Sequence, residues 1–156
     1  IVDIYLPDMK YGGPEEARRY SRAGDYVQVN QKAVAAMFRN AGPLLLDKNG
    51  IAYRGLCIRH LVLPSGRARS ENVAAFLLES FDAHDITISL MAQYRPMYRA
   101  GEFPEIDRML EVKEYDRAKQ LFERAEIGGY YQELGRLDDG FCIDFKKRKF
   151  DPLTGS

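Results

Sequence analysis

Cysteine and histidine are scarce in this sequence. Its 156 residues include two cysteines, Cys57 and Cys142, and two histidines, His60 and His84. Two cysteines are too few for a disulfide framework, and no CxxC-type spacing is present to hold a metal ion. The histidines stand far apart, so they predict no metal pair either. We therefore expect no metal site within this chain, and reduced thiols as in a cytoplasmic protein.

An excess of charge of either sign is also missing, as are long hydrophobic runs. The 23 basic residues match 23 acidic ones, whereas nucleic-acid-binding domains usually carry a clear basic excess. No apolar run reaches the roughly 18 residues of a membrane span, and the first residues lack a signal-peptide pattern. We therefore expect neither nucleic acid nor membrane as a partner.

What the sequence does contain is an alternation of strand and helix patterns. Apolar segments typical of strands lie at about residues 1–6, 56–63 and 86–91. Apolar residues at helical spacing predict helices at about residues 14–21, 29–41, 71–81 and 112–127. Pro14 suits a first helical position, and Ser70 suits a helix N-cap. This order predicts βαβ units, parallel strands and an α/β fold.

Two other segments lie outside this alternation. A hairpin is expected near residues 44–54, because Asn49-Gly50 is a strong turn signal between two apolar runs. Residues 128–156 are expected to form a C-terminal extension, with short strands at about 130–134 and 141–145. Its end, including the basic run at 146–149, is expected to be a frayed and solvated tail.

The predicted strands are too few for a complete fold. Three strands neither close a barrel nor make a comfortable open sheet, because the outer strands would keep unpaired backbone groups and bare apolar faces. The first residue already lies in a strand pattern, so we expect a piece of a longer protein. A missing N-terminal half or a second copy of the chain could cover the bare face. Alternatively, residues 44–54 and 130–145 could fold back over it.

Polar residues mark the ends of the predicted strands. Asp8 and Lys10 follow the first strand two positions apart, so their side chains point to the same side. Arg59 lies within the second strand where an apolar residue is expected, and Gln93 follows the third. Because ligands gather at the carboxyl ends of parallel strands, we expect Asp8, Lys10 and Arg59 to face one concave site. An Asp can hold an ammonium group and a Lys or Arg a carboxylate, although a solvated strand end is the simpler alternative.

Two residues of the second strand are expected to be structural. His60 follows Arg59 directly, so it faces the opposite side, where a hydrogen-bonded core histidine is the better interpretation. Cys57 is expected in the core. Cys142 has no assigned role.

Four stretches of the sequence together resemble a known family. They are "IYLPDMKY", "PEEARRYS", "YVQVNQKAVAAMFRN" and "IRHLVLPSG". They look like the radical S-adenosylmethionine (radical SAM) proteins, in the group similar to pyruvate formate-lyase activating enzyme. "RGLCIRHLVLPSG" and "AQYRP" further resemble an uncharacterised branch of that group. Full-length members have a partial (β/α)6 TIM-like barrel, a 4Fe-4S cluster on a CxxxCxxC loop, and S-adenosylmethionine at the carboxyl ends of the strands.

The resemblance implies both a fold and site residues. Residues 1–127 would be the second half of the barrel, followed by the extension at 128–156. Asp8 would hold the amino group of S-adenosylmethionine, Lys10 its carboxylate side, and Arg59 the carboxylate or the ribose. Gln93, near the place where related enzymes have a histidine, would be a further contact to S-adenosylmethionine. Because this chain lacks CxxxCxxC, the cluster would be bound by residues outside it.

The resemblance also implies a reaction. The complete protein would cleave S-adenosylmethionine to methionine and a 5′-deoxyadenosyl radical that abstracts hydrogen from a substrate, with a protein as the substrate class of the family. The isolated chain is expected to be inactive, and no catalytic residue is assigned within it. The main alternative is a cluster-free α/β binding or assembly module. A third reading is an aldolase-type barrel fragment with Lys10 as nucleophile, which the neighbouring Asp8 disfavours.

Overall fold

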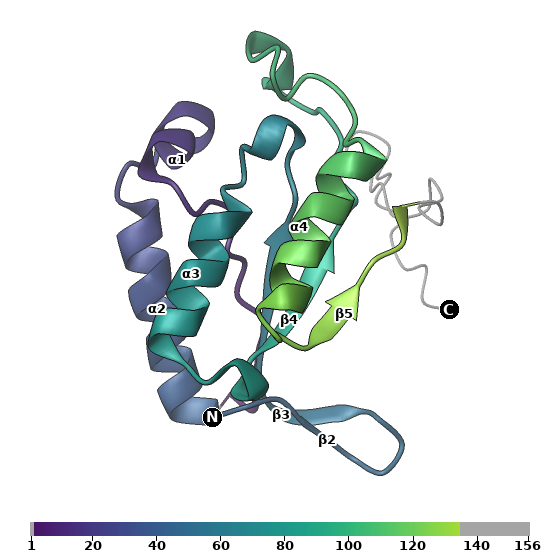
Figure 1. Ribbon diagram of the computed structural model, residues 1–156. Helices are drawn as coiled ribbons and strands as arrows, with labels where there is room; N and C mark the ends of the chain where they lie inside the picture. The colour runs from purple at the N-terminus through teal and green to yellow at the C-terminus, as the bar shows by residue number, and fades with distance from the viewer. Residues whose placement is uncertain (1, 135–156) are drawn as a thin grey trace, which may run out of the picture.

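The computed structural model describes residues 2–134, which form a sheet with helices packed on it (Figure 1). The strands are β1 (Ile4–Tyr5), β2 (Leu45–Leu46), β3 (Ala52–Leu61), β4 (Thr87–Met91) and β5 (Gly129–Tyr131). The α-helices are α1 (Pro14–Ser21), α2 (Tyr26–Ala41), α3 (Ser70–Ser80) and α4 (Val112–Arg124). Short 3-10 helices lie at η1 (Pro64–Gly66), η2 (Ala83–Asp85) and η3 (Ala100–Glu102). None of the described helices is long and apolar enough to cross a membrane.

The order of the strands in the sheet follows their order in the chain. The sheet runs β1-β3-β4-β5, and these four strands are parallel, while β2 pairs antiparallel with β3. The prediction of an α/β fold with parallel strands is therefore confirmed. The strand expected at 130–134 lies at Gly129–Tyr131 and pairs with β4, so this part of the expected extension belongs to the sheet. The strand expected at 141–145 and the basic run at 146–149 lie outside the described residues.

β1 is short because of a proline. Pro7 has no backbone N–H to donate to β3, which interrupts the regular ladder after Tyr5. Pairing nevertheless continues past it, because Arg59 N–H donates to the Pro7 carbonyl at 2.9 Å and Met9 N–H donates to the Arg59 carbonyl at 2.8 Å. The strand predicted at 1–6 is therefore present, but its regular part covers only Ile4–Tyr5. Irregular pairing with β3 continues to Met9.

The hairpin forms where Asn49-Gly50 predicted it, but its second arm is not a separate strand. The Asp47 carboxylate accepts the N–H groups of Asn49 and Ile51, which closes the turn. The returning arm begins at Ala52 and continues without a break as β3. The two predicted elements, a hairpin near 44–54 and a strand at 56–63, therefore merge, because the antiparallel arm leads directly into the parallel pairing.

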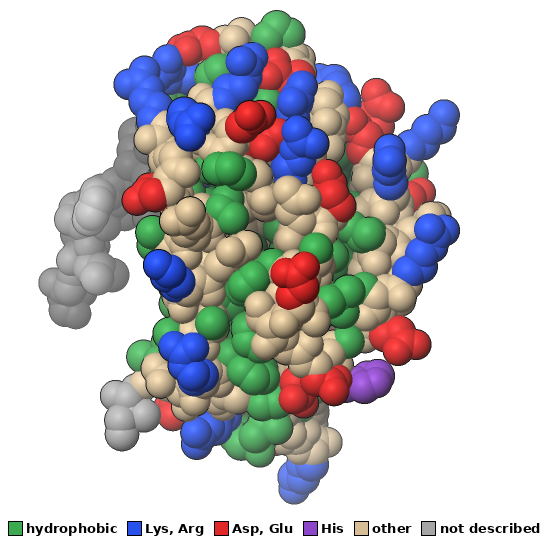
Figure 2. All heavy atoms as spheres, turned by 60° about the vertical axis from the view of Figure 1, so that its left-hand side comes forward, with side chains coloured by type: hydrophobic (Ala, Val, Ile, Leu, Met, Phe, Trp, Pro, Cys, Tyr) green, Lys and Arg blue, Asp and Glu red, His purple; other side chains and the backbone are tan. Residues whose placement is uncertain are grey.

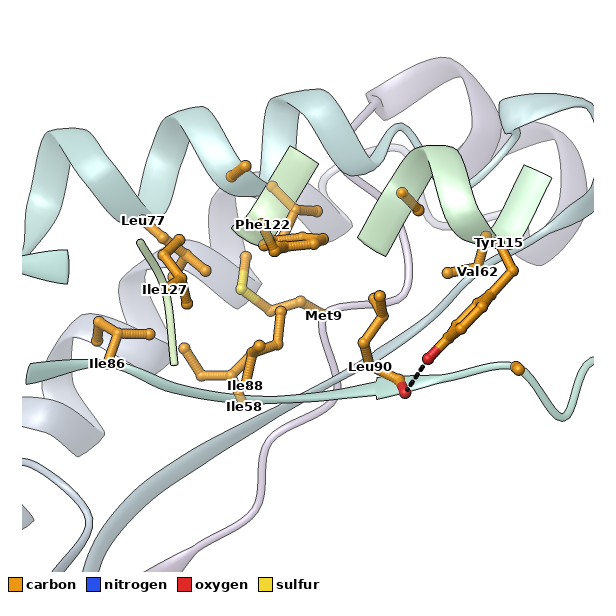
Figure 3. Packing of buried hydrophobic residues seen from close by; sticks show 14 of the residues in the cluster. Met9, Ile58, Val62, Leu77, Ile86, Ile88, Leu90, Tyr115, Phe122 and Ile127 are labelled. Atoms are coloured by element: carbon orange, nitrogen blue, oxygen red, sulfur yellow. Dashed lines mark hydrogen bonds between the residues drawn. The ribbon is translucent and has the colours of Figure 1, made fainter. Parts of the chain in front are cut away.

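The core lies between one face of the sheet and helices α2, α3 and α4. Alternate residues of β3 and β4 face these helices, among them Ile58 and Ile88, which are fully buried. Phe122 of α4 packs over them, and Tyr115 of the same helix donates its hydroxyl to the Leu90 carbonyl at 3.2 Å (Figure 3). The apolar stripe predicted on the last helix therefore provides a large part of this core.

Helix boundaries agree with the prediction except at four ends, two of which, at either end of α3, differ by a single residue. α1 covers the predicted residues, with Pro14 at its start. α2 begins three residues earlier than expected, and Val29, placed in its apolar stripe, is 58% exposed. The last helix ends at Arg124, three residues short of the predicted 127. Ser70 is not the N-cap of α3 but its first residue, because its hydroxyl bonds a buried histidine instead.

One glycine is needed for the outer strand to pair closely. Gly129 opens β5 with a φ of 153°, and a Cβ atom there would lie 1.9 Å from the Ile88 carbonyl oxygen. Any side chain would therefore push β5 away from β4. Gly128-Gly129, which the sequence indicated as a helix stop, thus also allows the approach of this strand.

Candidate functional site

Asp8, Lys10 and Arg59 lie together at the carboxyl ends of β1 and β3. Asp8 forms an isolated parallel bridge with Arg59. The Arg59 guanidinium donates through Nε to Asp8 Oδ1 at 2.6 Å, and Lys10 Nζ lies 4.0 Å from Asp8 Oδ2. The two-residue spacing of Asp8 and Lys10 predicted that their side chains share a direction, and the structure places both in one cluster with Arg59. We call Asp8, Lys10 and Arg59 the charged trio.

The charged trio lies on the face of the sheet opposite the core. His60, next to Arg59, is fully buried among the helices, so Arg59 points the other way. The register places Ser89 of β4 beside Arg59, and Tyr130 of β5 beside Ser89. We call this surface the open face, because helices α2, α3 and α4 pack on the opposite side of the sheet.

The charges of the trio are partly exposed and unequal in number. The side chains of Asp8, Arg59 and Lys10 are 30%, 45% and 58% exposed. Two cations therefore share one carboxylate, and the guanidinium retains N–H groups beyond the one that Asp8 accepts. Such a set can bind a ligand that carries both an ammonium and a carboxylate group. Since exposed ion pairs add only about 0–1 kcal/mol to stability, the trio is not needed to hold the fold.

Gln93 lies beyond the end of β4, and its described hydrogen-bond partners are Met91 and Gln132, not the charged trio. Its amide nitrogen lies 3.8 Å from the Met91 sulfur, and its amide oxygen accepts from Gln132 at 3.4 Å. Gln132 is itself fixed by the Ala92 N–H, which donates to its amide oxygen at 2.8 Å. The pairing of Met91 with Leu61 puts Gln93 past the last rung of β3. Its described contacts therefore join it to the β5 side of the open face.

Tyr26 and Asn30 hold the backbone of the charged trio and were missed from the sequence. The Tyr26 hydroxyl accepts the Lys10 N–H and donates to the Asp8 carbonyl, both at 2.9 Å. Asn30 Nδ2 donates to the same carbonyl at 2.9 Å. The two residues are four positions apart at the start of α2, so they occupy one helix face. The sequence feature that could have indicated this contact is Asn30 itself, a polar residue within the predicted helix at 29–41.

His60 supports the same strand end from the core side. One ring nitrogen, Nδ1, lies 2.6 Å from the Met9 carbonyl, and Nε2 lies 2.8 Å from the Ser70 hydroxyl. Because a carbonyl can only accept, Nδ1 carries the proton and Ser70 donates to Nε2. Complete burial lowers the pKa of His60 to about 4, so the imidazole is neutral. The prediction of a satisfied structural histidine is confirmed. Cys57 is buried as predicted, and burial raises the pKa of its thiol, but strand alternation places it on the Arg59 side of the sheet, away from the core between sheet and helices.

Two carboxylates tie the loop that follows β4 to neighbouring helices, Glu105 to α1 and Glu114 to the start of α4. Glu105 accepts from Arg19 at 2.9 Å and from the Tyr20 hydroxyl at 2.8 Å. Its own backbone N–H and the Tyr20 hydroxyl lower its pKa to about 2. Glu114 is held by Arg108 at 2.6 Å, and this guanidinium is the main reason that its pKa falls to about 2. Acidic and basic side chains accordingly intermingle at the upper end of the molecule in Figure 2.

A cavity of about 600 Å³ lies on the helix side, not at the charged trio. Its walls come from η1, the start of α3 and the face of α4 that carries Arg117 and Arg124. Among residues 2–134, no group of three or more His, Cys, Asp or Glu is placed to hold a metal ion.

An uncharacterised protein of Methanocaldococcus jannaschii is 30% identical over 132 residues, which are 84% of this chain and 34% of the relative. The chain therefore spans about a third of the length of the curated relative that it matches. No family model matches the chain, and no solved structure matches it.

Proposed function

We propose that this chain is the second half of a partial (β/α)6 barrel in a radical S-adenosylmethionine protein similar to pyruvate formate-lyase activating enzyme. The observation that carries the proposal is the charged trio. Asp8, Arg59 and Lys10 converge at the carboxyl ends of adjacent parallel strands, with Asp8 Oδ1 2.6 Å from Arg59 Nε. This is the end at which barrel enzymes bind their ligands. The chemistry of the trio suits the amino and carboxylate groups of the methionine part of S-adenosylmethionine.

The strand order supports the barrel half. Along β1-β3-β4-β5, each parallel strand neighbours the preceding one in the chain. Helices α2, α3 and α4 pack on a single face, whereas open doubly wound sheets have helices on both faces. In a barrel, the other face becomes the interior. The open face, which carries Arg59 and Ser89, would then line that interior.

The reaction would need groups that this chain does not supply. The chain has two cysteines, fewer than the three thiolates of CxxxCxxC, so the cluster would be held by residues outside it. When bound, the cluster supplies one electron, which yields methionine and a 5′-deoxyadenosyl radical that takes a hydrogen atom from the substrate. The residues of this chain would bind and orient S-adenosylmethionine through Asp8, Lys10 and Arg59. A protein is the substrate class that the resemblance implies.

A test compares the isolated chain with the full-length protein of the parent gene. After anaerobic reconstitution, the isolated chain is expected to bind no iron and to form no 5′-deoxyadenosine. The full-length protein is expected to bind a 4Fe-4S cluster, measured by absorbance and iron analysis, and to form 5′-deoxyadenosine in the presence of a reductant. A parent sequence without CxxxCxxC, or a stoichiometric cluster on the isolated chain, would contradict the proposal.

A cluster-free assembly module is the second candidate, and the apolar residues of the open face favour it. Leu6 and Tyr130 are 58% and 52% exposed, and in an assembly module a second copy of this chain would cover them. An aldolase has less support, because Lys10 is 58% exposed and lies 4.0 Å from a carboxylate, without the desolvation that a nucleophilic lysine needs.

The isolated chain is expected to self-associate through its open face. Covering apolar side chains on a sheet face that α2, α3 and α4 leave bare is favourable, so light scattering should show a mass that rises with concentration. Leu6→Lys, on the open face, should shift the chain toward the monomer. Leu78→Lys is the matched control, because Leu78 is 46% exposed on α3, on the helix side of the sheet. A wild-type chain that stays monomeric at every concentration would contradict this expectation.

A further inference from the structure

We infer that Tyr26 and Asn30, in the first two turns of α2, are positioning residues that aim Asp8 and Lys10 at the ligand. For the identity of that ligand the inference rests on the proposed function. The contacts themselves do not depend on it. They join a helix to the strand end that carries two members of the charged trio.

The Tyr26 hydroxyl spans both sides of Met9. It accepts the Lys10 N–H and donates to the Asp8 carbonyl, each at 2.9 Å. One oxygen atom thereby fixes the two peptide units that flank Met9. Because the direction of a Cα–Cβ bond follows from its backbone, fixing these units also fixes the directions of the Asp8 and Lys10 side chains.

Asn30 adds a second donor at a cost to stability. Its Nδ2 donates to the Asp8 carbonyl, which already accepts from Tyr26. Its Oδ1 is buried and has no hydrogen-bond partner within the described part of the chain. A buried acceptor without a partner is unfavourable, whereas an apolar side chain of similar size would avoid that penalty. The amide is therefore explained better by the Asp8 carbonyl that it holds than by the stability of the helix.

The same strand end is held independently from β3. Met9 N–H donates to the Arg59 carbonyl at 2.8 Å, and His60 donates to the Met9 carbonyl at 2.6 Å. These bonds remain when Tyr26 or Asn30 is replaced, so the strand end stays attached to the sheet. The α2 contacts can thus be removed to test the aim of the side chains without detaching the strand.

The first test measures S-adenosylmethionine affinity in the full-length protein by calorimetry, together with its melting temperature. Tyr26→Phe keeps the ring packed against Tyr11, whose centroid is 5.7 Å away, and loses only the hydroxyl. Asn30→Leu is expected to weaken binding about fivefold, the factor that one neutral hydrogen bond represents, and Tyr26→Phe, which removes two such bonds, at least as much. Tyr20→Phe is the matched control, because its hydroxyl bonds Glu105 instead. The control should bind as the wild type does.

The melting temperature distinguishes positioning from a structural role. Asn30→Leu removes the unpartnered acceptor, so its melting temperature should be unchanged or higher while its affinity falls. A merely structural asparagine would give the reverse, a lower melting temperature with unchanged affinity. Wild-type affinity in both variants would overturn the inference and leave the proposed function standing.

A second readout uses the isolated chain and no ligand. Amide hydrogen exchange at Lys10 should become faster in Tyr26→Phe, because its N–H loses its described acceptor, and should stay unchanged in Tyr20→Phe. If the wild-type full-length protein binds no S-adenosylmethionine, the proposed function fails, and this exchange rate alone decides whether Tyr26 fixes the backbone between Asp8 and Lys10. Unchanged exchange at Lys10 would then overturn the inference.

Discussion

The proposed function predicts that exchanging the two charges of the Asp8–Arg59 pair, by Asp8→Arg with Arg59→Asp, will weaken S-adenosylmethionine binding to the full-length protein by about 100-fold or more. The estimate corresponds to the loss of two charge-assisted hydrogen bonds. In the exchanged protein, the ligand ammonium would meet a guanidinium and its carboxylate would meet a carboxylate. The affinity is measured by calorimetry at constant ionic strength.

The same exchange is expected to leave the fold nearly intact. The side chains of Asp8 and Arg59 are 30% and 45% exposed. After the exchange the two side chains still carry opposite charges and can attract each other. The free energy of unfolding should therefore change by no more than about 1 kcal/mol. The matched control exchanges Lys119 and Glu123, an i,i+4 pair on α4 at 3.7 Å, and should affect neither quantity. Wild-type affinity in the Asp8/Arg59 exchange would show that the trio is not a ligand site.

Acidification is expected to destabilise the isolated chain through His60. Burial lowers the pKa of this imidazole from its ordinary 6.5 to about 4 in the folded protein. Between these values the unfolded chain binds the proton and the folded chain does not, so stability rises with pH and is lost as pH falls from about 6.5 toward 4. The full loss is on the order of 3 kcal/mol, because each pKa unit corresponds to about 1.4 kcal/mol.

Urea unfolding between pH 7.5 and 4.5 measures this loss. The range stops there because Glu105 and Glu114, whose pKa values are lowered from 4.5 to about 2, lose their own stabilisation at lower pH. His60→Gln should be less stable at pH 7.5 but should show a flatter pH dependence. His84→Gln is the control: it replaces the other histidine, at an exposed position, and should keep the pH dependence of the wild type. A wild-type slope in His60→Gln would contradict the assignment to His60.

Local patterns were sufficient for the parts of the fold that depend on neighbouring residues. Pro14 and the acidic residues after it placed α1 correctly. Side-chain alternation in strands predicted that Arg59 and His60 face opposite ways, and the structure places one beside Asp8 and the other in the core. In both cases the decisive information lies within a few adjacent residues.

Contacts between distant segments could not be predicted in the same way. Arg19 and Glu105 are 86 residues apart, and nothing near either residue indicates the other. Ser70 has the sequence pattern of an N-cap. Its hydroxyl instead forms a hydrogen bond with the buried His60 imidazole, which the residues near Ser70 do not indicate. The role of Asn30 was hidden for the same reason, since its partner is a backbone carbonyl 22 positions away.

The hairpin gives this chain a natural point of attachment. Its turn at Lys48 and Asn49 is exposed and extends from the amino end of β3, whereas the charged trio lies at the carboxyl end of the same strand (Figure 1). A linker placed at Lys48 would therefore orient every molecule on a sensor surface with its charged end toward the solution. Immobilised in that way, the chain presents Asp8, Lys10 and Arg59 to whatever flows past, and the support itself cannot block them.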